Sequence, residues 1–351
     1  MRNKFIYLAI CAALALSACG SNLPPHIAAQ FGTPTPTPFL PGFAIESLPD
    51  DKSASVLAIS YADDSPEKTD GTPWGRFPAP SALSEIAIPA PVEPLTQPEG
   101  QINILIMGSD QRPGDGGFRT DVMLLLTLDK INGRVSATSF PRDLYLYIPG
   151  WRVDRINVAQ ARGGFDMTAL TFDYNLGVRP DHWVLVNFDG FTQVIDSLGG
   201  ITVQVGRSLS DQREGFGTYG VSAGSVAMDA ETALWYVRSR GTSNDFDRTR
   251  RQQEVLQAIF LRFLSLDALT RAPDLYEAYR QTVTTDLSIG DILGLLPLAN
   301  DIKNGLPVDR YAIGPNEVIP YVTSGGASVL LPDENAVRAV MSQAVEHQSS
   351  P

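Results

Sequence analysis

Short apolar runs, each bounded by polar or turn-forming residues, recur between residues 101 and 205. The runs INILIM at 102–107, VMLLLTL at 122–128 and HWVLVNF at 182–188 are typical of buried strands, and ITVQV at 201–205 alternates apolar and polar positions. The second run continues through Asn132-Gly133, a strong hairpin signal, into a further strand. These patterns predict several strands, two of them joined in a hairpin.

Segments with helical periodicity alternate with these strands. In FTQVIDSLGG the apolar residues recur at i, i+3, i+4 and i+7: Phe191, Val194, Ile195 and Leu198. Further helices are predicted at 166–177, with Asp166 as the N-cap and Gly177 as the stop, at 229–236, and from about Asp247. Strands and helices that alternate around a hairpin predict an α/β fold, with a mixed central β-sheet flanked by helices on both faces in an α/β/α sandwich.

The first nineteen residues have the pattern of an export signal. Arg2 and Lys4 precede an apolar stretch from Phe5 to Leu16, and the segment ends in LSAC at 16–19. This ending resembles a lipobox, which predicts a lipoprotein-type signal peptide at 1–19 and a lipid on Cys19. The expected location is the extracytoplasmic face of a bacterial cytoplasmic membrane, although ordinary cleavage after the Ala-Cys pair is the alternative.

Proline dominates the region that follows the signal. Residues 20–98 contain 15 of the chain's 26 prolines, a composition that favours extended, unpaired backbone. We therefore expect 20–98 to be a largely disordered linker, and we expect a single folded domain at 99–346.

The formal net charge of -12 argues against a nucleic-acid partner, because phosphate-backbone binding needs a broad basic face. Five arginines nevertheless gather in VRSRGTSNDFDRTRRQQEVL at 237–256. Along an extended segment Arg238 and Arg240 point to one face. Along the following helix Arg248 shares a stripe with Gln252, Val255 and Ile259, with Arg251 beside it, whereas Arg250 points away and is expected to be solvated.

Other charged residues stand at the ends of the predicted strands. The hairpin places Arg119, Asp121 and Arg142 at one edge, and Asp110 joins them if the first strand runs parallel to the third. Guanidinium groups bind phosphate oxygens bidentately, and carboxylates hold Mg²⁺. A phosphate or diphosphate site is one interpretation, and a salt-bridge network that fixes the loops is the other.

Several ordered blocks resemble the LytR-CpsA-Psr (LCP) family of bacterial envelope proteins. They include NILIMGSDQR, FRTDVMLLLTLD, SFPRDLYLYIPG, RINVAQARGG and DFDRTRRQQEVL, and the resemblance covers about residues 101–265. It implies a phosphotransferase that moves a glycopolymer from a polyprenyl-diphosphate carrier to peptidoglycan through a phosphodiester. In the LCP-type fold the lipid lies in an apolar tunnel and the diphosphate at its mouth.

The resemblance also implies roles for individual residues. Asp110 and Asp121 would serve a Mg²⁺ site, and Asp110, Arg119 and Arg142 would take part in catalysis. The residues expected to bind the diphosphate or lie near it are Arg119, Arg142, Arg238, Arg240, Arg248, Asp245, Gln252 and, at the entrance, Asn157. The residues expected in the lipid tunnel are Val122, Leu124, Leu126, Val184, Val186, Phe191, Ile195, Val255 and Ile259. Asp247 replaces the family's usual glycine and is expected to point outward.

Two other functions stay open at this point. The same site could hydrolyse a lipid-linked diphosphate with water as the acceptor, which would make the protein a pyrophosphatase. Alternatively, the protein could be a non-enzymatic lipoprotein whose arginines bind an envelope polymer.

Overall fold

The computed structural model describes residues 74–110, 119–241, 245–265 and 283–346. The predicted signal peptide, Cys19 and most of the predicted linker lie outside these ranges, and so does the side chain of Asp245. Within these ranges, no helix has both the length and the apolar character needed to span a membrane.

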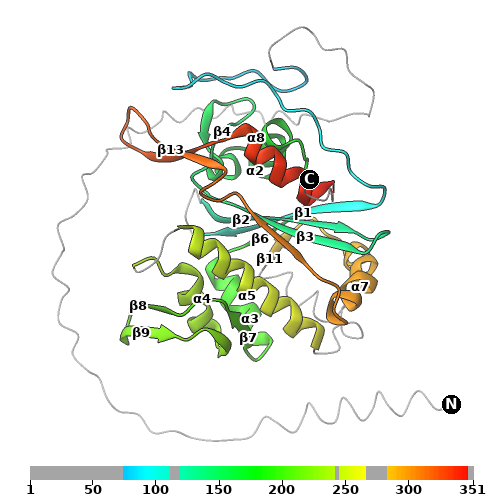
Figure 1. Ribbon diagram of the computed structural model, residues 1–351, viewed down its shortest axis with the longest axis vertical. Coiled ribbons are helices and arrows are strands. Elements are labelled where there is room, and N and C mark those ends of the chain that lie inside the picture. The colour runs from blue at the N-terminus through cyan, green and yellow to red at the C-terminus, as the bar shows by residue number, and fades with distance from the viewer. Residues whose placement is uncertain (1–73, 111–118, 242–244, 266–282, 347–351) are drawn as a thin grey trace, which may run out of the picture. The chain divides into compact units, whose positions relative to one another are not determined.

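A six-stranded mixed sheet forms the centre of the fold (Figure 1). Its order is β11 (Val283–Thr285), β6 (His182–Val186), β1 (Gln101–Ser109), β2 (Thr120–Asp129), β3 (Arg134–Phe140) and β12 (Asp309–Ala312). Both β1 and β3 pair antiparallel with β2, so they run parallel to each other. The predicted turn at Asn132-Gly133 joins β2 to β3, and Gly133 has the positive φ of 62° that this turn requires. The predicted mixed sheet is confirmed.

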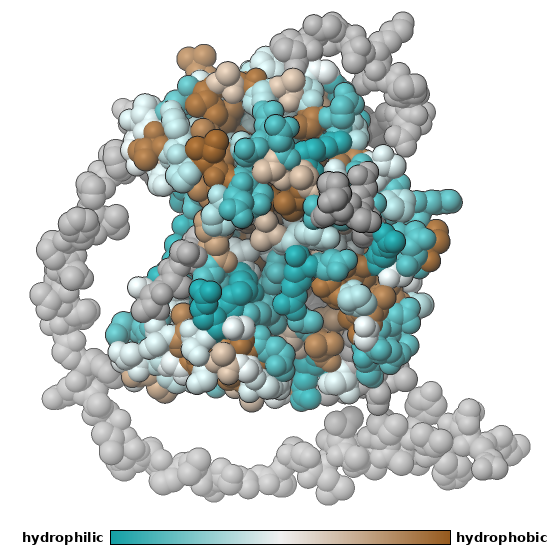
Figure 2. All heavy atoms as spheres, in the orientation of Figure 1, coloured by the Kyte–Doolittle hydropathy of each residue, from teal (hydrophilic) through white to brown (hydrophobic). Residues whose placement is uncertain are grey.

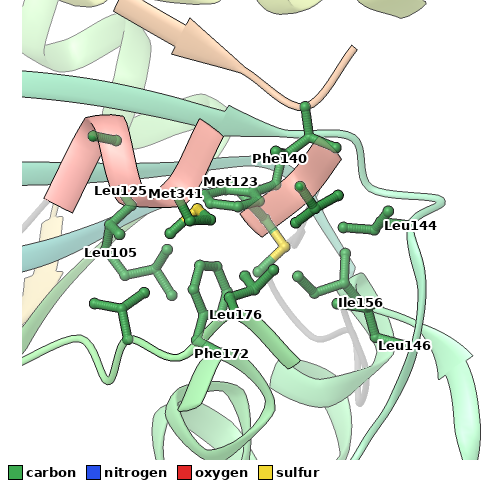
Figure 3. Packing of buried hydrophobic residues seen from close by; sticks show 14 of the residues in the cluster. Leu105, Met123, Leu125, Phe140, Leu144, Leu146, Ile156, Phe172, Leu176 and Met341 are labelled. Atoms are coloured by element: carbon green, nitrogen blue, oxygen red, sulfur yellow. The ribbon is translucent and has the colours of Figure 1, made fainter. Parts of the chain in front are cut away.

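Two helices, α2 (Asn157–Leu176) and α8 (Glu334–Val345), cover one face of the sheet. Figure 3 shows Leu105 and Leu125 of the sheet directed toward Phe172 of α2 and Met341 of α8. The rings of Phe140 and Phe172 meet edge to face, with their centroids 5.0 Å apart. Because alternate strand residues point to opposite faces, this core uses only one set of strand side chains and leaves the other set for the opposite face.

The helix predicted from Asp166 begins earlier than expected. It starts at Asn157, and Gly163 and Gly164 interrupt its helical backbone just before Asp166. Its end is as predicted, because Gly177 adopts the left-handed conformation, with φ 69°, and its N–H donates to the carbonyl of Asp173.

The opposite face is turned toward α3 (Phe188–Ser197), α4 (Ala230–Arg238), α5 (Asp245–Ser265) and α7 (Ile289–Lys303). The chain between α3 and α4 forms two small sheets, β7 (Ile201–Val205) with β10 (Gly224–Met228) and β8 (Leu209–Arg213) with β9 (Gly217–Val221). The predicted strand at 201–205 therefore forms, but outside the central sheet. Helices on both faces of the sheet confirm the predicted α/β/α arrangement.

Two further hairpins complete the described fold. They are β4 (Tyr145–Tyr147) with β5 (Val153–Arg155), and β13 (Val318–Val322) with β14 (Ser328–Pro332). In the space-filling view apolar residues gather over β13, where Ile319 and Val322 are exposed (Figure 2).

The end of the predicted linker is part of the folded unit, so the domain boundary expected at residue 99 is wrong. The rings of Phe77 and Tyr174 lie 4.9 Å apart, and Phe77 and Leu95 are buried. The hydroxyl of Tyr174 donates to the carbonyl of Pro89 at 2.6 Å, and the Tyr147 hydroxyl donates to the Pro78 carbonyl at 2.7 Å. Proline lacks an N–H but keeps its carbonyl, so a proline-rich segment can still dock through acceptors.

We predict that a chain starting at residue 99 is much less stable than one starting at 74. Loss of Phe77 and Leu95 alone removes two buried apolar side chains, each contributing about 1.5 to 3 kcal/mol. The expected fall in Tm is about 10 °C, measured by circular dichroism during heating. Equal melting temperatures for the two chains would show that 74–98 contributes nothing to the fold.

Candidate functional site

A cavity of about 990 Å³ lies between the sheet and helices α3, α4 and α5. Its floor consists of side chains from three adjacent strands. Ile106 pairs with both Leu124 and Val184, and Gly108 pairs with both Val122 and Val186. Residues two apart on a strand share a face, so these two rows together line the cavity.

Gly108 permits close packing of the floor. A Cβ atom added there would lie 2.9 Å from Cγ2 of Val122, which is too close for an unshifted side chain. The glycine therefore lets the Val122 side chain pack directly against the backbone of β1.

Apolar side chains form most of the cavity wall. From α3 and α4 they are Phe188, Phe191, Val194, Leu198, Leu234 and Val237. From α5 and beyond they are Val255, Leu256, Ile259, Phe260, Phe263, Val283, Leu287 and Ile292. Of the residues expected in a lipid tunnel, Val122, Leu124, Val184, Val186, Phe191, Val255 and Ile259 line this cavity.

The character of the wall changes along α5. Arg248 and Gln252 line the cavity near the start of the helix, and Phe260 and Phe263 line it near the end. At a rise of about 1.5 Å per residue, Arg248 and Phe263 are about 22 Å apart along the helix axis. The cavity is therefore charged at one end and apolar along most of its length, which suits an amphiphilic ligand.

The charged end gathers residues from five separate elements. Asp110 follows β1, Asp121 lies near the start of β2, and Arg142 follows β3. These residues meet because β1 and β3 both run antiparallel to β2. The remaining charged lining residues come from α4, the turn after it, and α5: Arg238, Arg240 and Arg248. Four arginines against two aspartates leave an excess of positive charge in an acidic protein.

A chain of ion pairs links the strand ends. Arg142 Nη1 lies 2.7 Å from Oδ1 of Asp121, and its Nε lies 3.3 Å from Oδ2 of Asp143. Asp143 also contacts Arg155, at 3.4 Å. Arg142 is thus held by two carboxylates while its side chain is still 24% exposed.

Arg119 does not join the charged lining. Its backbone N–H donates to Oδ1 of Asp110 at 3.0 Å, but its side chain is exposed and is not among the residues that line the cavity. The strand register shifts between Gly108 and Ser109, so Ser109 pairs with Thr120. Arg119, which was expected at the same edge as Asp121, therefore does not line the cavity.

Arg238 and Arg240 both line the cavity, but not from an extended segment as predicted. Arg238 is the last residue of α4, and the chain leaves the helix at Ser239, where ψ is 135°. The guanidinium of Arg238 lies 4.3 Å from the ring centroid of Phe188. A helix end followed by one extended residue therefore brings both arginines to the cavity.

Asp211 of β8 holds the turn that carries Arg240. Its carboxylate accepts hydrogen bonds from the Ser239 hydroxyl and, at 2.7 Å, from the N–H of Gly241. The hydrogen bond from Ser239 is the largest cause of a lowered pKa at Asp211. Any Cβ at position 241 would collide with this carboxylate, which explains the glycine there.

Arg251 is fully buried but does not face the cavity, contrary to expectation. It donates to the carbonyls of Tyr236 and Ser239, the latter at 2.6 Å, and its Nε lies 3.4 Å from Asp247. It therefore braces the end of α4 from behind. Helical periodicity placed Arg251 next to the stripe that contains Arg248. The two side chains nevertheless have different surroundings, because Arg248 lines the cavity and Arg251 packs against the end of α4.

Asp247 and Arg250 form ion pairs with each other, so neither is simply solvated. Arg250 Nη2 lies 2.7 Å from Asp247, and Arg250 also pairs with Glu254. Asp247 is not among the cavity-lining residues. Asp247 pairs with Arg250 and Arg251, and Arg248 lines the cavity.

Three other predicted residues do not line the cavity. Ile195 is fully buried in an apolar cluster that it shares with wall residues such as Val194 and Leu198, but Ile195 itself does not line the cavity. Leu126 packs in the cluster that includes Leu298 of α7. Asn157 is buried at the start of α2, which covers the other face of the sheet.

Among the described residues, no group of three or more His, Cys, Asp and Glu side chains is arranged to hold a metal ion. Asp110 and Asp121 nevertheless both line the charged end. Two carboxylates completed by phosphate oxygens and water are a common environment for Mg²⁺. The donor set therefore fits Mg²⁺ that arrives with a phosphate ligand.

Comparisons with known proteins agree with this architecture. The polyisoprenyl-teichoic acid–peptidoglycan teichoic acid transferase TagU of Oceanobacillus iheyensis is 31% identical over 223 residues, which cover 61% of this chain and 68% of TagU. The crystal structure of Bacillus subtilis TagV matches with a TM-score of 0.60 and 27% identity, over 71% of this chain and 98% of that one.

A structure described as TagT bound to LI-WTA has a TM-score of 0.58 and 27% identity to this chain, and covers 71% of this chain and 92% of TagT. The model of the LytR_cpsA_psr family matches residues 79–337, nearly the whole described fold and both ends of the cavity. The chain therefore belongs to the LytR_cpsA_psr family.

Proposed function

We propose that this protein transfers a glycopolymer from a polyprenyl-diphosphate carrier to peptidoglycan through a phosphodiester bond. The observation that carries the proposal is a cavity that changes from four arginines at one end to an apolar wall along α5. A polyprenyl diphosphate has the same two parts, a dianionic head and a long apolar chain. The names of TagU and of the TagT complex support the same class of substrate.

In the proposed reaction a hydroxyl of peptidoglycan attacks the carrier-distal phosphorus, and polyprenyl phosphate leaves in line. Arg142, Arg238, Arg240 and Arg248 bind the phosphoryl oxygens and stabilise the charge that develops on them. Positioning and electrostatics supply most of the acceleration, since phosphoryl transfer needs little covalent chemistry from the protein.

We assign the hydroxyl proton to Asp110, because Asp121 forms an ion pair with Arg142, whereas Asp110 accepts a hydrogen bond from an uncharged backbone N–H. Asp110 and Asp121 would also hold Mg²⁺ against the phosphates. When bound, the ion would neutralise part of the diphosphate charge. Mg²⁺ dependence is therefore part of the proposal.

The proposed location is the outer face of the cytoplasmic membrane, with a lipid on Cys19 as the anchor. The supporting observation is the LSAC sequence at 16–19. An anchor there would keep the cavity close to the bilayer that contains the carrier. This proximity matters because moving the apolar chain of the carrier from the bilayer into water costs free energy.

Supplying a labelled lipid-linked polymer with and without peptidoglycan fragments tests the proposal. We expect label to join the fragments, and carrier to be consumed faster when fragments are present. Release of polymer phosphate at one rate, whether or not fragments are added, would favour the pyrophosphatase. Binding of polymer without any consumption of carrier would favour the non-enzymatic lipoprotein.

Replacing Ile259 with tryptophan is predicted to obstruct the lipid chain. Ile259 lines the cavity from the middle of α5, so a larger side chain there competes with the ligand for space. We expect the Kd for the long-chain carrier to rise about tenfold.

Gln257→Trp is the matched control, because Gln257 lies on the same helix but contacts Arg310 instead of lining the cavity. A carrier analogue with one isoprene unit should bind Ile259→Trp and wild type equally. Equal long-chain affinity in Ile259→Trp and Gln257→Trp would contradict the assignment of the apolar wall to the lipid.

Asp211 is predicted to act through Arg240. Removing its carboxylate in Asp211→Ala frees the turn at Ser239 and Gly241, and we expect the transfer rate to fall about ten- to a hundredfold. The measurement is a double-mutant cycle with Arg240→Ala. If Asp211 acts only by placing Arg240, Asp211→Ala adds little further loss once Arg240 is gone, whereas additive losses would refute that role.

A further inference from the structure

The β8–β9 hairpin carries a group of aromatic rings outside the cavity. Phe216, at the turn, is 60% exposed, and its ring centroid lies 5.8 Å from that of Tyr219. Tyr219 meets Trp235 of α4 edge to face at 5.0 Å. None of these three residues lines the cavity. We refer to Phe216, Tyr219 and Trp235 as the aromatic platform.

The platform is held rigidly although it lies at the surface. The guanidinium carbon of Arg213 is 4.4 Å from the ring centroid of Phe216 and 4.6 Å from that of Tyr219. Arg213 is fixed in turn by the Thr232 hydroxyl at 3.2 Å. The indole N–H of Trp235 donates to the carbonyl of Gln212 at 3.0 Å. Rings that are already ordered lose little entropy when a ligand binds them.

The charges beside the platform balance each other, which favours a neutral sugar over an anion. Glu231, whose side chain is 82% exposed, lies 3.6 Å from Arg213 and offsets its charge. A pyranose ring offers C–H groups on its faces and hydroxyls at its edge, and the electron-rich face of an aromatic ring complements the C–H groups.

The hairpin also connects the platform to the charged end of the cavity. Asp211, which holds the turn carrying Arg240, lies two residues before Arg213 on β8, about 7 Å along the strand. Asp211 pairs directly with Tyr219 on β9. A polysaccharide lying on the hairpin would therefore lead toward Arg240.

We infer that the aromatic platform binds neutral amino-sugar rings of the acceptor polysaccharide and directs an acceptor hydroxyl toward the diphosphate. The inference rests on the proposed function, because a binding site for the acceptor has a use only if polymer is transferred to peptidoglycan. The binding of sugar at the platform can nevertheless be tested separately from transfer.

Binding of chitotetraose, a neutral β-linked N-acetylglucosamine tetramer, to the full-length protein tests the platform, with calorimetry as the readout. We expect Phe216→Ala to raise the Kd about three- to tenfold relative to wild type. Phe216→Trp should retain binding and Phe216→Leu should not, because stacking needs a ring. Ile319→Ala removes another exposed apolar side chain, on β13, and should bind like wild type.

A transfer assay distinguishes failure of this inference from failure of the proposed function. With peptidoglycan fragments as acceptor, Phe216→Ala should raise the acceptor KM by the same factor and leave kcat and carrier affinity unchanged. If wild type transfers polymer while Phe216→Ala matches it in both KM and sugar binding, the platform assignment is wrong. If wild type binds chitotetraose through Phe216 but consumes no carrier, only the proposed function fails. If Phe216→Ala does not fold, the comparison of the chitotetraose Kd between Phe216→Leu and Phe216→Trp decides the outcome.

Discussion

Replacing Arg142 with alanine is expected to lower the rate of glycopolymer transfer by about a hundred- to a thousandfold. Arg142 lines the charged end of the cavity and lies 2.7 Å from Asp121, so it is placed to stabilise charge on the phosphoryl group and to orient a proposed metal ligand. The loss should fall mainly on kcat, because the charge that Arg142 meets is greatest in the transition state.

Arg142→Lys is the informative companion to this variant. Lysine keeps the charge but cannot contact Asp121 and a phosphate through a planar fork, so we expect only a small part of the rate to return. Unfolding curves of both variants show whether they fold, because the loss of Arg142 also removes its ion pairs with Asp121 and Asp143. Transfer within a few-fold of wild type in folded Arg142→Ala would remove this residue from the reaction.

The second large effect is expected at a residue that does not line the cavity. Arg251→Ala removes a fully buried guanidinium and leaves the carbonyls of Tyr236 and Ser239 without its hydrogen bonds. It also removes one cation from the buried side of Asp247. Breaking such a pair costs about 3 to 5 kcal/mol of unfolding free energy, measured by urea denaturation.

Arg152→Ala provides the comparison for Arg251→Ala. Arg152 also pairs with an aspartate, Asp154, at 2.9 Å, but its side chain is 44% exposed. Its loss should cost no more than about 1 kcal/mol. Similar losses in the two variants would mean that Arg251 does not brace α4 and α5.

Much of the charged end could be predicted from the sequence because strand topology determines which residues become neighbours. The Asn132-Gly133 turn defines the β2–β3 hairpin, and the hairpin places Asp121 beside Arg142. Placing Asp110 beside them also required the direction of β1 relative to β3. The structure shows that these two strands are parallel. Periodicity of two likewise predicted that Val122 and Leu124 share a face.

The errors arose where local geometry departs from regular repeats. A register shift at the end of β1 accompanies the displacement of Arg119 from the cavity. On α5 and α3 a helical stripe was too coarse to separate Arg251 from Arg248, or Ile195 from Val194. Wall residues on β1, such as Ile106, were missed. They could have been found by extending the face that contains Leu124 from β2 to its other neighbour, β1.

Proline content was a misleading guide to where the folded unit begins. Composition describes average backbone preference, whereas docking of 74–98 depends on particular partners, such as the pair between Arg76 and Asp173 at 2.7 Å. Spaced apolar residues within the segment, including Phe77 and Leu95, were the signal that composition concealed.

Mass spectrometry of lipid extracted from the purified protein tests the central claim most directly, namely that the 990 Å³ cavity holds a polyprenyl phosphate or diphosphate. We expect such a lipid in wild type and in Gln257→Trp, and much less of it in Ile259→Trp. The absence of any prenyl lipid from repeated folded preparations of wild type, or equal amounts in all three proteins, would contradict the account.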